Sequence, residues 1–214
     1  MKAKDLLNLE RNDITLVAVS KTKPIEEIKK KYNEGFINFG ENRVNELVQK
    51  FNLLPKDINW HMIGHLQTNK VKKVVPIVSL IHSIDTIKLL KIVNKESKKI
   101  NKVTNCLIQI NISQESTKYG FDNNEIDFLN KSFLKDYKNI KIRGLMGMAS
   151  FSNEENIVKS EFENLNKIYN NVKNSIDDIN ILSMGMSNDY KLALEAGSNM
   201  VRIGSKIFGA RNYQ

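Results

Sequence analysis

The feature that most constrains this chain is a repeated alternation of short apolar runs with longer segments whose apolar residues recur at helical spacing. The first run, ITLVAVS at 14–20, is apolar nearly throughout, as expected of a strand that is buried on both faces. In the segment that follows, Thr22 is a candidate helix cap, Pro24 suits a first helical turn, and Gly35 is expected to end the helix. The pattern predicts eight strands, at 14–20, 36–40, 58–64, 78–84, 104–112, 140–148, 179–186 and 199–204.

The segments between these strands predict helices. One helix is expected to carry Ile126, Leu129 and Phe133, and the spacing of apolar residues after it marks a long helix through Val158 and Tyr169. A short helix at 205–210 would complete the series. The remaining helices are expected at 44–51, 68–74, 85–99 and 189–196.

This order of elements predicts an α/β fold, a single (β/α)8 barrel of the TIM type that occupies residues 1–214 as one domain. The rival is a doubly wound open sheet, which uses the same alternation. Eight strands without a glycine-rich fingerprint after the first strand favour closure. Too few residues follow Gly204 for a full eighth helix, and the amphipathic opening of the chain, with Leu6, Leu7 and Leu9, is expected to cover that gap.

Composition narrows the classes of partner. The net charge of +9 raises the question of nucleic acid, but only five of the 33 basic residues are Arg, the residue that groove and phosphate recognition favours. The lysines are scattered, which indicates a solvated surface rather than a nucleic-acid site. No run approaches the roughly 18 apolar residues of a membrane span, and the amino terminus lacks a secretory apolar core. We therefore expect a cytoplasmic protein that binds no membrane, and the single Cys106 excludes internal disulfides.

The carboxyl ends of the predicted strands carry the candidate site, because barrel sites form there. Lys21 follows the first strand, where partial desolvation would lower the pKa of a lysine and free its amine to condense with a carbonyl. Ser187 follows the seventh strand, and Gly204 and Ser205 follow the eighth, at the tips where barrels commonly bind phosphate. With Arg202 on the eighth strand, these residues predict pyridoxal 5′-phosphate held as a Schiff base on Lys21.

Several longer segments carry a resemblance to a known family. They are AVSKTKP (18–24), FGENRVNE (39–46), WHMIGHLQTNK (60–70), GLMGM (144–148) and SMGMSNDYKLALEAGSNMVRIGSKIFGAR (183–211), and STKYGF (116–121) adds to them. The chain resembles the pyridoxal phosphate homeostasis protein family, also called the proline synthetase co-transcribed homologues, which is similar to the barrel domain of bacterial alanine racemase. The resemblance covers about residues 14–213 and implies a monomeric barrel that binds pyridoxal phosphate on Lys21.

The resemblance also implies which residues hold the cofactor. They are Asn42 beside the ring, Ser187 with the amides of Gly204 and Ser205 at the phosphate, Arg202 at the pyridine nitrogen, and Met186 and Ile203 as apolar walls. His65 and Met146 are further candidates. By contrast, His61 and His82 lie inside strands and are expected to be core residues, and Cys106 is expected to be a small buried hydrophobe.

Two functions remain open at this point. Arg202 is a permanent cation and would disfavour protonation of the ring nitrogen, which weakens the ring as an electron sink. Alanine racemases use a second base from a further domain, and this chain shows no motif that would replace it. The resemblance therefore implies a carrier that buffers pyridoxal phosphate or delivers it to apo-enzymes that depend on it. The alternative is a weak amino-acid racemase in which His65 or a water is the other base.

Overall fold

The computed structural model describes residues 13–113 and 119–209. Eight strands close into one barrel in chain order, and β8 pairs in parallel with β1. The predicted (β/α)8 barrel is therefore confirmed, and the open doubly wound sheet is excluded. The strands are β1 (Thr15–Val19), β2 (Asn38–Glu41), β3 (Asn59–Met62), β4 (Leu80–Ile84), β5 (Thr104–Gln109), β6 (Ile140–Met146), β7 (Ile181–Ser183) and β8 (Met200–Ile203).

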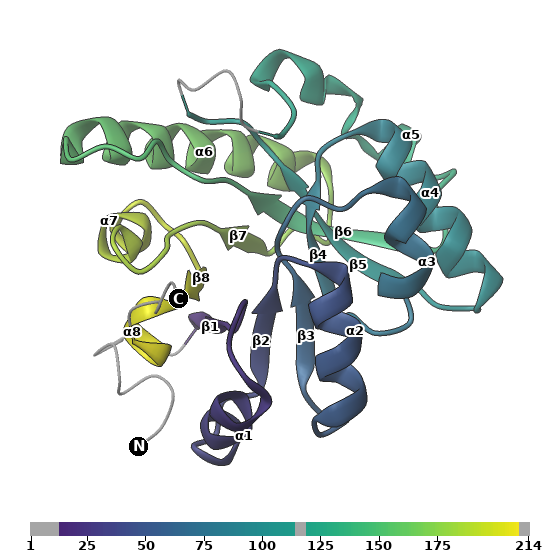
Figure 1. The fold of residues 1–214 in the computed structure, drawn as a ribbon. Helices are drawn as coiled ribbons and strands as arrows, with labels where there is room; N and C mark the ends of the chain where they lie inside the picture. Colours follow the sequence, from purple (N-terminus) through teal and green to yellow (C-terminus); the bar gives the residue numbers. More distant parts are fainter. Residues whose placement is uncertain (1–12, 114–118, 210–214) are drawn as a thin grey trace.

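The helices surround the barrel wall, as Figure 1 shows. They are α1 (Ile25–Asn33), α2 (Val44–Leu53), α3 (Val71–Val74), α4 (Ile87–Lys99), α5 (Lys131–Leu134), α6 (Glu155–Ser175), α7 (Tyr190–Glu195) and α8 (Ser205–Phe208). Short 3₁₀ helices occupy Thr68–Lys70 and Asn123–Phe128. No helix in the described part of the chain is long and apolar enough to cross a membrane.

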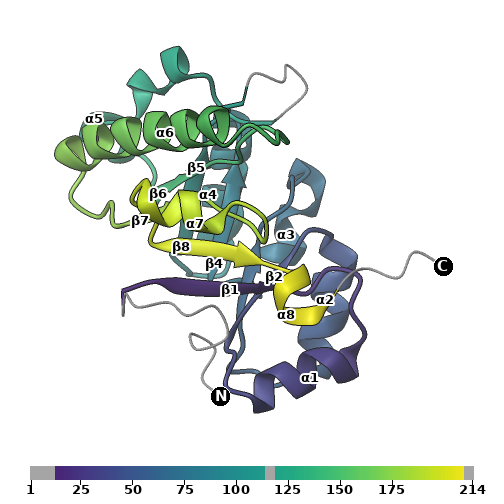
Figure 2. The same cartoon turned by 90° about the vertical axis from the view of Figure 1, so that its left-hand side faces the viewer.

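The closing pair of strands determines which side chains face the site. Figure 2 shows β1 and β8 side by side, with α8 directly after β8. Val17 is in register with Arg202, and Ala18 with Ile203. Because side chains alternate along a strand, Val17 and Arg202 face the barrel interior. Ala18 and Ile203 pack outward, in the large core cluster between the wall and the helices.

The apolar core accordingly has two layers. The outer layer joins strand residues to the buried faces of the helices, for example Phe162 and Leu165 of α6. The inner layer is a separate cluster from five strands, namely Val17, Leu80, Leu107, Met146 and Met200. The barrel is thus filled by side chains, and its free space lies at the ends of the strands.

Two local predictions are wrong. The helix expected through Ile126, Leu129 and Phe133 is a 3₁₀ segment followed by α5, because the Asn130 side chain accepts the Phe133 amide and starts a new helix. Thr22 is not the cap of α1, which begins at Ile25 after Pro24.

The opening segment with Leu6, Leu7 and Leu9, expected to cover the gap left by a short eighth helix, lies outside the described residues. The last expected helix, at 205–210, is seen as α8, which ends at Phe208, while residue 210 is also outside the described ranges.

Candidate cofactor-binding site

A cavity of about 640 Å³ opens at the carboxyl ends of β1, β7 and β8. It lies where the sequence predicts a site, since the loops after the strands of a barrel meet at this end. The structure brings seven of the eight predicted cofactor-binding residues to its lining: Lys21, Asn42, Met186, Ser187, Arg202, Gly204 and Ser205.

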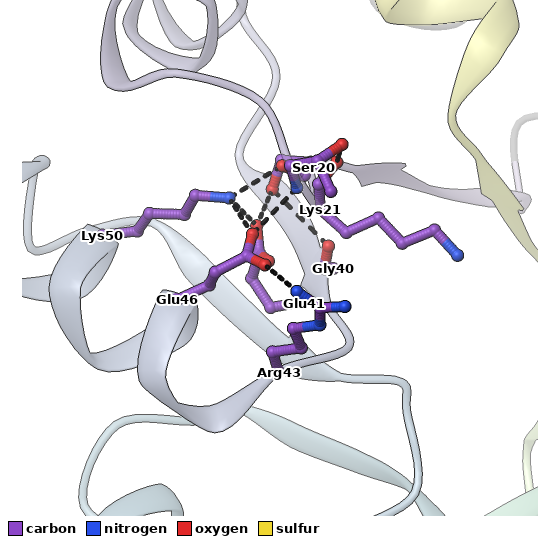
Figure 3. Close-up of polar contacts among 8 residues, drawn as sticks. Ser20, Lys21, Gly40, Glu41, Arg43, Glu46 and Lys50 are labelled. Atoms are coloured by element: carbon purple, nitrogen blue, oxygen red, sulfur yellow. Dashed lines mark hydrogen bonds and ion pairs between the residues drawn. The ribbon is translucent and has the colours of Figure 1, made fainter. Parts of the chain in front are cut away.

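Lys21 reaches this cavity from a tight turn after β1. The Ser20 amide donates to the Gly40 carbonyl at 3.0 Å, and the Lys23 amide donates to the Ser20 carbonyl at 3.0 Å. Within the turn Thr22 has φ of 65°, a left-handed conformation that β-branched residues rarely adopt. The half-buried Lys21 side chain leaves the turn on the side opposite Lys50, as Figure 3 shows. The turn therefore presents the Lys21 side chain to the cavity.

Hydroxyl and amide groups gather at the tips of β7 and β8. Ser187 Oγ accepts the Gly204 amide at 3.2 Å, which places the two tips side by side. Gly204 precedes α8, and the first amides of a helix lack partners inside it. Asp189 Oδ1 accepts the Met186 amide at 2.5 Å and holds the β7 loop. Ser187, Gly204 and Ser205 thus gather hydroxyl and amide groups at one end of the cavity.

Two glycines allow the loops to approach closely. A Cβ on Gly64 would lie 2.5 Å from the Asn42 carbonyl oxygen, so only glycine lets the end of β3 pass this close to Asn42. Gly185 has φ of 96°, and a Cβ there would lie 2.6 Å from the Ala193 Cβ of α7. Asn42 and the β7 tip are thus held by backbone packing.

Arg202 is the buried cation of the cavity. Its Nη1 donates to Ser183 O at 2.9 Å and to Ser183 Oγ at 2.7 Å, and its Nη2 donates to Gly147 O at 3.0 Å. Burial lowers the pKa of Arg202 to about 10, with the carboxylate of Asp189 acting in the opposite direction. The guanidinium therefore keeps its charge at neutral pH.

A chain of hydrogen bonds runs from Arg202 through the barrel interior. Ser183 Oγ lies 3.2 Å from His82 Nδ1, His82 Nε2 lies 2.9 Å from His61 Nδ1, and His61 Nε2 lies 3.3 Å from Asn38 Oδ1. Burial lowers the pKa of His61 to about 4. Burial, together with His61 and Arg202, also lowers the pKa of His82 well below its ordinary value. Both imidazoles are therefore neutral at physiological pH.

The two ends of this chain set its direction. A guanidinium only donates, so the Ser183 hydroxyl accepts from Arg202 and turns its own hydrogen to His82 Nδ1. A neutral His82 then carries its hydrogen on Nε2 and donates to His61, which donates to the Asn38 side-chain oxygen. Every member is satisfied in one arrangement, and the Arg202 side chain is fixed at one end of it.

Three candidates from the sequence lie away from the cavity. Ile203 is fully buried among the outward-facing core residues, so its position gives no support to a role as an apolar wall. Met146 is buried in the inner cluster of the barrel. His65 lines a different cavity of about 670 Å³, where its Nδ1 lies 2.7 Å from Asp85 Oδ2 and its ring stacks on Tyr119.

The expected core residues are buried. His61, His82 and Cys106 are at most 4% exposed, which confirms their placement, and burial raises the pKa of the Cys106 thiol. Their sequence context gave no sign of the contact between the two imidazoles, because residues 61 and 82 meet only across β3 and β4.

The chain matches known proteins over nearly its whole length. A family model described as "Alanine racemase, N-terminal domain" matches residues 5–212. The pyridoxal phosphate homeostasis protein of Pasteurella multocida is 38% identical over 205 residues, which are 94% of this chain and 88% of the relative. That of Schizosaccharomyces pombe is 39% identical over 202 residues, or 93% of this chain and 85% of the relative. This chain belongs to the pyridoxal phosphate homeostasis protein family.

A solved structure supports the same family. PipY of Synechococcus elongatus is 29% identical and covers 96% of this chain and 97% of its own. The TM-score is 0.90 to its structure without pyridoxal phosphate and 0.86 to its structure with pyridoxal phosphate bound. The structural similarity to PipY therefore extends over nearly the whole barrel.

Some residues that line the cavity were not predicted from the sequence to bind the cofactor. Lys23 lines the cavity, and its Nζ donates to the Phe208 carbonyl at 2.9 Å. Met148 and Asp189 also line it. Lys23 stands in the AVSKTKP segment, so the motif itself was the available signal.

Proposed function

We propose that this protein binds pyridoxal 5′-phosphate reversibly through Lys21 and takes part in the intracellular homeostasis of that cofactor, by buffering and delivering it. The observation that carries the proposal is one cavity lined by an amine at the tip of β1 and by hydroxyl and amide donors at the tips of β7 and β8. The names of the relatives and the cofactor bound in PipY support the same ligand.

The residues present fit such a ligand. A phosphate needs several donors, and Ser187, Gly204 and Ser205 offer hydroxyl and amide groups at one end of the cavity. The pyridine nitrogen of the cofactor can accept a hydrogen bond, and the Arg202 guanidinium is a hydrogen-bond donor that remains charged. Pyridoxal phosphate supplies a reactive aldehyde when bound.

Lys21 would hold the cofactor covalently. Its neutral amine adds to the aldehyde carbon, a carbon–nitrogen double bond forms, and the aldehyde oxygen leaves as water. Addition of water to that bond reverses the step and returns the free amine and the aldehyde. A Schiff base on Lys21 thus allows both capture and release.

The test is a titration with pyridoxal phosphate, followed by absorbance at about 420 nm, the region expected for a protonated Schiff base of this cofactor. Wild-type protein is expected to become yellow, and borohydride reduction should leave the mass label on the peptide that contains Lys21. Lys21→Ala should lose both signals. Lys23→Ala is the matched control, because Lys23 lines the same cavity two residues away. A Lys21→Ala variant that still bound the cofactor covalently contradicts the proposal.

We further propose that the protein carries the cofactor without turnover of its own. Racemisation needs a second base near the α-carbon. Besides Lys21, the titratable residues that line the cavity in the described chain are Lys23, Asp189 and Arg202. Lys23 is held by Glu27 and Phe208, and Asp189 by the Met186 amide. His65, the alternative base, lines the other cavity.

Proton exchange separates a carrier from a weak racemase. The loaded protein would be incubated with L-alanine or L-serine in deuterated water, and deuterium at the α-carbon measured by mass spectrometry. No exchange above that of free pyridoxal phosphate supports a carrier. Exchange that saturates with amino acid and disappears in Lys21→Ala supports the racemase.

The proposal also covers the domain organisation, oligomeric state, cellular location and partners of the protein. We take residues 1–214 as a single cofactor-binding domain of a monomeric, cytoplasmic protein whose recipients are apo-enzymes that depend on pyridoxal phosphate. Light scattering on a sizing column tests the monomer. Recovery of activity by an apo-enzyme mixed with the loaded protein, in the presence of a scavenger of free cofactor, tests delivery.

A further inference from the structure

A buried charged cluster lies directly behind the turn that carries Lys21. It consists of Ser20, Glu41, Glu46 and Lys50, and we call it the Lys50 cluster (Figure 3). Lys50 Nζ donates to Glu41 Oε1 at 2.8 Å, to Glu46 Oε2 at 3.1 Å and to the Ser20 carbonyl at 2.8 Å. An ammonium group has three hydrogens to donate, so its capacity is filled.

The Lys50 cluster is expected to contribute little to the free energy of unfolding. The Lys50 and Glu41 side chains are 5% and 0% exposed, and desolvation of two charges offsets most of the attraction between them. Burial raises the pKa of Glu41, with Lys50 acting against it. Among the described residues, Glu41 Oε2 has no hydrogen-bond partner. We therefore expect the cluster to fix the geometry of the neighbouring backbone rather than to raise the free energy of unfolding.

The geometry that the cluster sets is that of the backbone on both sides of Lys21. Before it, Ser20 donates its hydroxyl to Glu41 Oε1 at 2.6 Å, and its carbonyl accepts from Lys50. After it, the Thr22 amide donates to Glu46 Oε2 at 2.8 Å. Thr22 is the residue with the left-handed φ of 65°, so this bond stabilises an unfavourable conformation.

The cluster acts from outside the cavity. Lys50 is not among the described residues that line it, whereas Lys21 is. Figure 3 shows the Lys21 side chain extending away from Lys50, Glu41 and Glu46. The α2 helix carries Glu46 and Lys50. It thereby fixes the backbone position from which the Lys21 side chain extends.

We propose that Lys50, acting through Glu41 and Glu46, is a positioning residue that holds the Lys21 amine where it can bond to the aldehyde carbon of a ligand whose phosphate is bound at the tips of β7 and β8. The inference rests on the proposed function. Bond formation between two groups depends steeply on their placement, and an error of about 1 Å costs up to about a hundredfold. Binding of the phosphate and ring alone does not require that placement.

The experiment compares two ligands in the full-length protein. Pyridoxal 5′-phosphate has the aldehyde, while pyridoxine 5′-phosphate has the same ring and phosphate with a hydroxymethyl group instead and cannot form the bond. In Lys50→Met the affinity for pyridoxal phosphate is expected to fall by about tenfold or more, with the affinity for pyridoxine phosphate within about twofold of wild type. Lys99→Met, which removes the exposed Lys99–Glu96 pair on α4, is the matched control and should change neither affinity.

A second variant covers the case in which Lys50→Met does not fold. Glu46 is 23% exposed, and Glu46→Ala leaves the Lys50–Glu41 pair in place while removing the acceptor of the Thr22 amide. The same split between the two ligands is expected, measured well below the thermal midpoint of the variant.

Three outcomes count against the inference. Equal losses for both ligands would mean that the cluster only maintains the fold, and no loss for either would mean that Lys21 is placed by other contacts. A wild-type protein that binds pyridoxine phosphate but makes no covalent bond to pyridoxal phosphate would remove the role of Lys21, and with it the proposed function.

Discussion

At the scale of single residues, the structure separates side chains that look alike in the sequence. The chain has 28 lysines. The AVSKTKP motif singles out Lys21, and the cavity lining agrees with it. Lys50 carried no motif, yet it stands three residues after Leu47 on the buried face of α2, and this spacing was the signal that could have revealed a buried lysine. Sequence reasoning recognised residue roles where a motif existed and missed those that depend on a helix face.

Gly64 offers a residue-scale prediction. In Gly64→Ala the added Cβ would meet backbone atoms of Asn42 at 2.5 and 2.8 Å, and backbone cannot move aside cheaply. We expect a loss of about 1–3 kcal/mol in the free energy of unfolding, measured by urea denaturation. Gly204→Ala is the control, since its Cβ would be 3.6 Å from Val19 and its unfolding free energy should stay level or rise slightly. Equal stability of the two variants would show that the β3 loop can yield.

At the scale of elements, hydrophobic periodicity predicted all eight strands, although their observed boundaries differ from the predicted ones by up to a few residues at either end. It failed between β5 and β6. There Ile126, Leu129 and Phe133 have helical spacing, but Asn130 caps a new helix and divides the segment. A local side-chain bond to the backbone competes with the helix, and apolar spacing contains no information about that competition.

The hydrogen-bonded chain that joins β8, β7, β4, β3 and β2 gives an element-scale prediction. Ser183→Ala removes the hydroxyl that accepts from Arg202 and lies beside His82 Nδ1, so two buried polar groups lose a partner. We expect a loss of about 1–3 kcal/mol in the free energy of unfolding. Ser79→Ala, which removes an exposed hydroxyl bonded to Asn59 at 3.3 Å, should cost less than about 0.5 kcal/mol. If the two variants lost the same amount, the chain would contribute nothing beyond an ordinary surface contact.

At the scale of the whole molecule, the closure of the barrel could be predicted from the sequence, but the polar side chains that meet inside it could not. Counting strand–helix units was enough to expect a barrel, because eight parallel strands without a fingerprint for an open sheet close on themselves. The residues that meet inside it, Asn38, His61, His82, Ser183 and Arg202, are up to 164 positions apart, from 202 − 38. Each of these residues alone has the sequence context of a core residue, so their chain of hydrogen bonds is seen only in the assembled barrel.

The same interior makes the stability of the whole protein depend on pH. Burial lowers the pKa of His61 from 6.5 to about 4, so the unfolded chain takes up a proton at this site before the folded chain does. Stability is therefore fully present above pH 6.5 and is lost as the pH falls toward 4, by about 3 kcal/mol for this residue alone. In His61→Gln the slope of unfolding free energy against pH over this interval should be shallower by up to about 1.4 kcal/mol per pH unit. Carboxylates titrate in both proteins and cancel in the comparison. Parallel slopes in urea denaturation series at several pH values would mean that His61 is already charged in the folded barrel, and His61 Nδ1 would then donate to His82 Nε2 rather than accept from it.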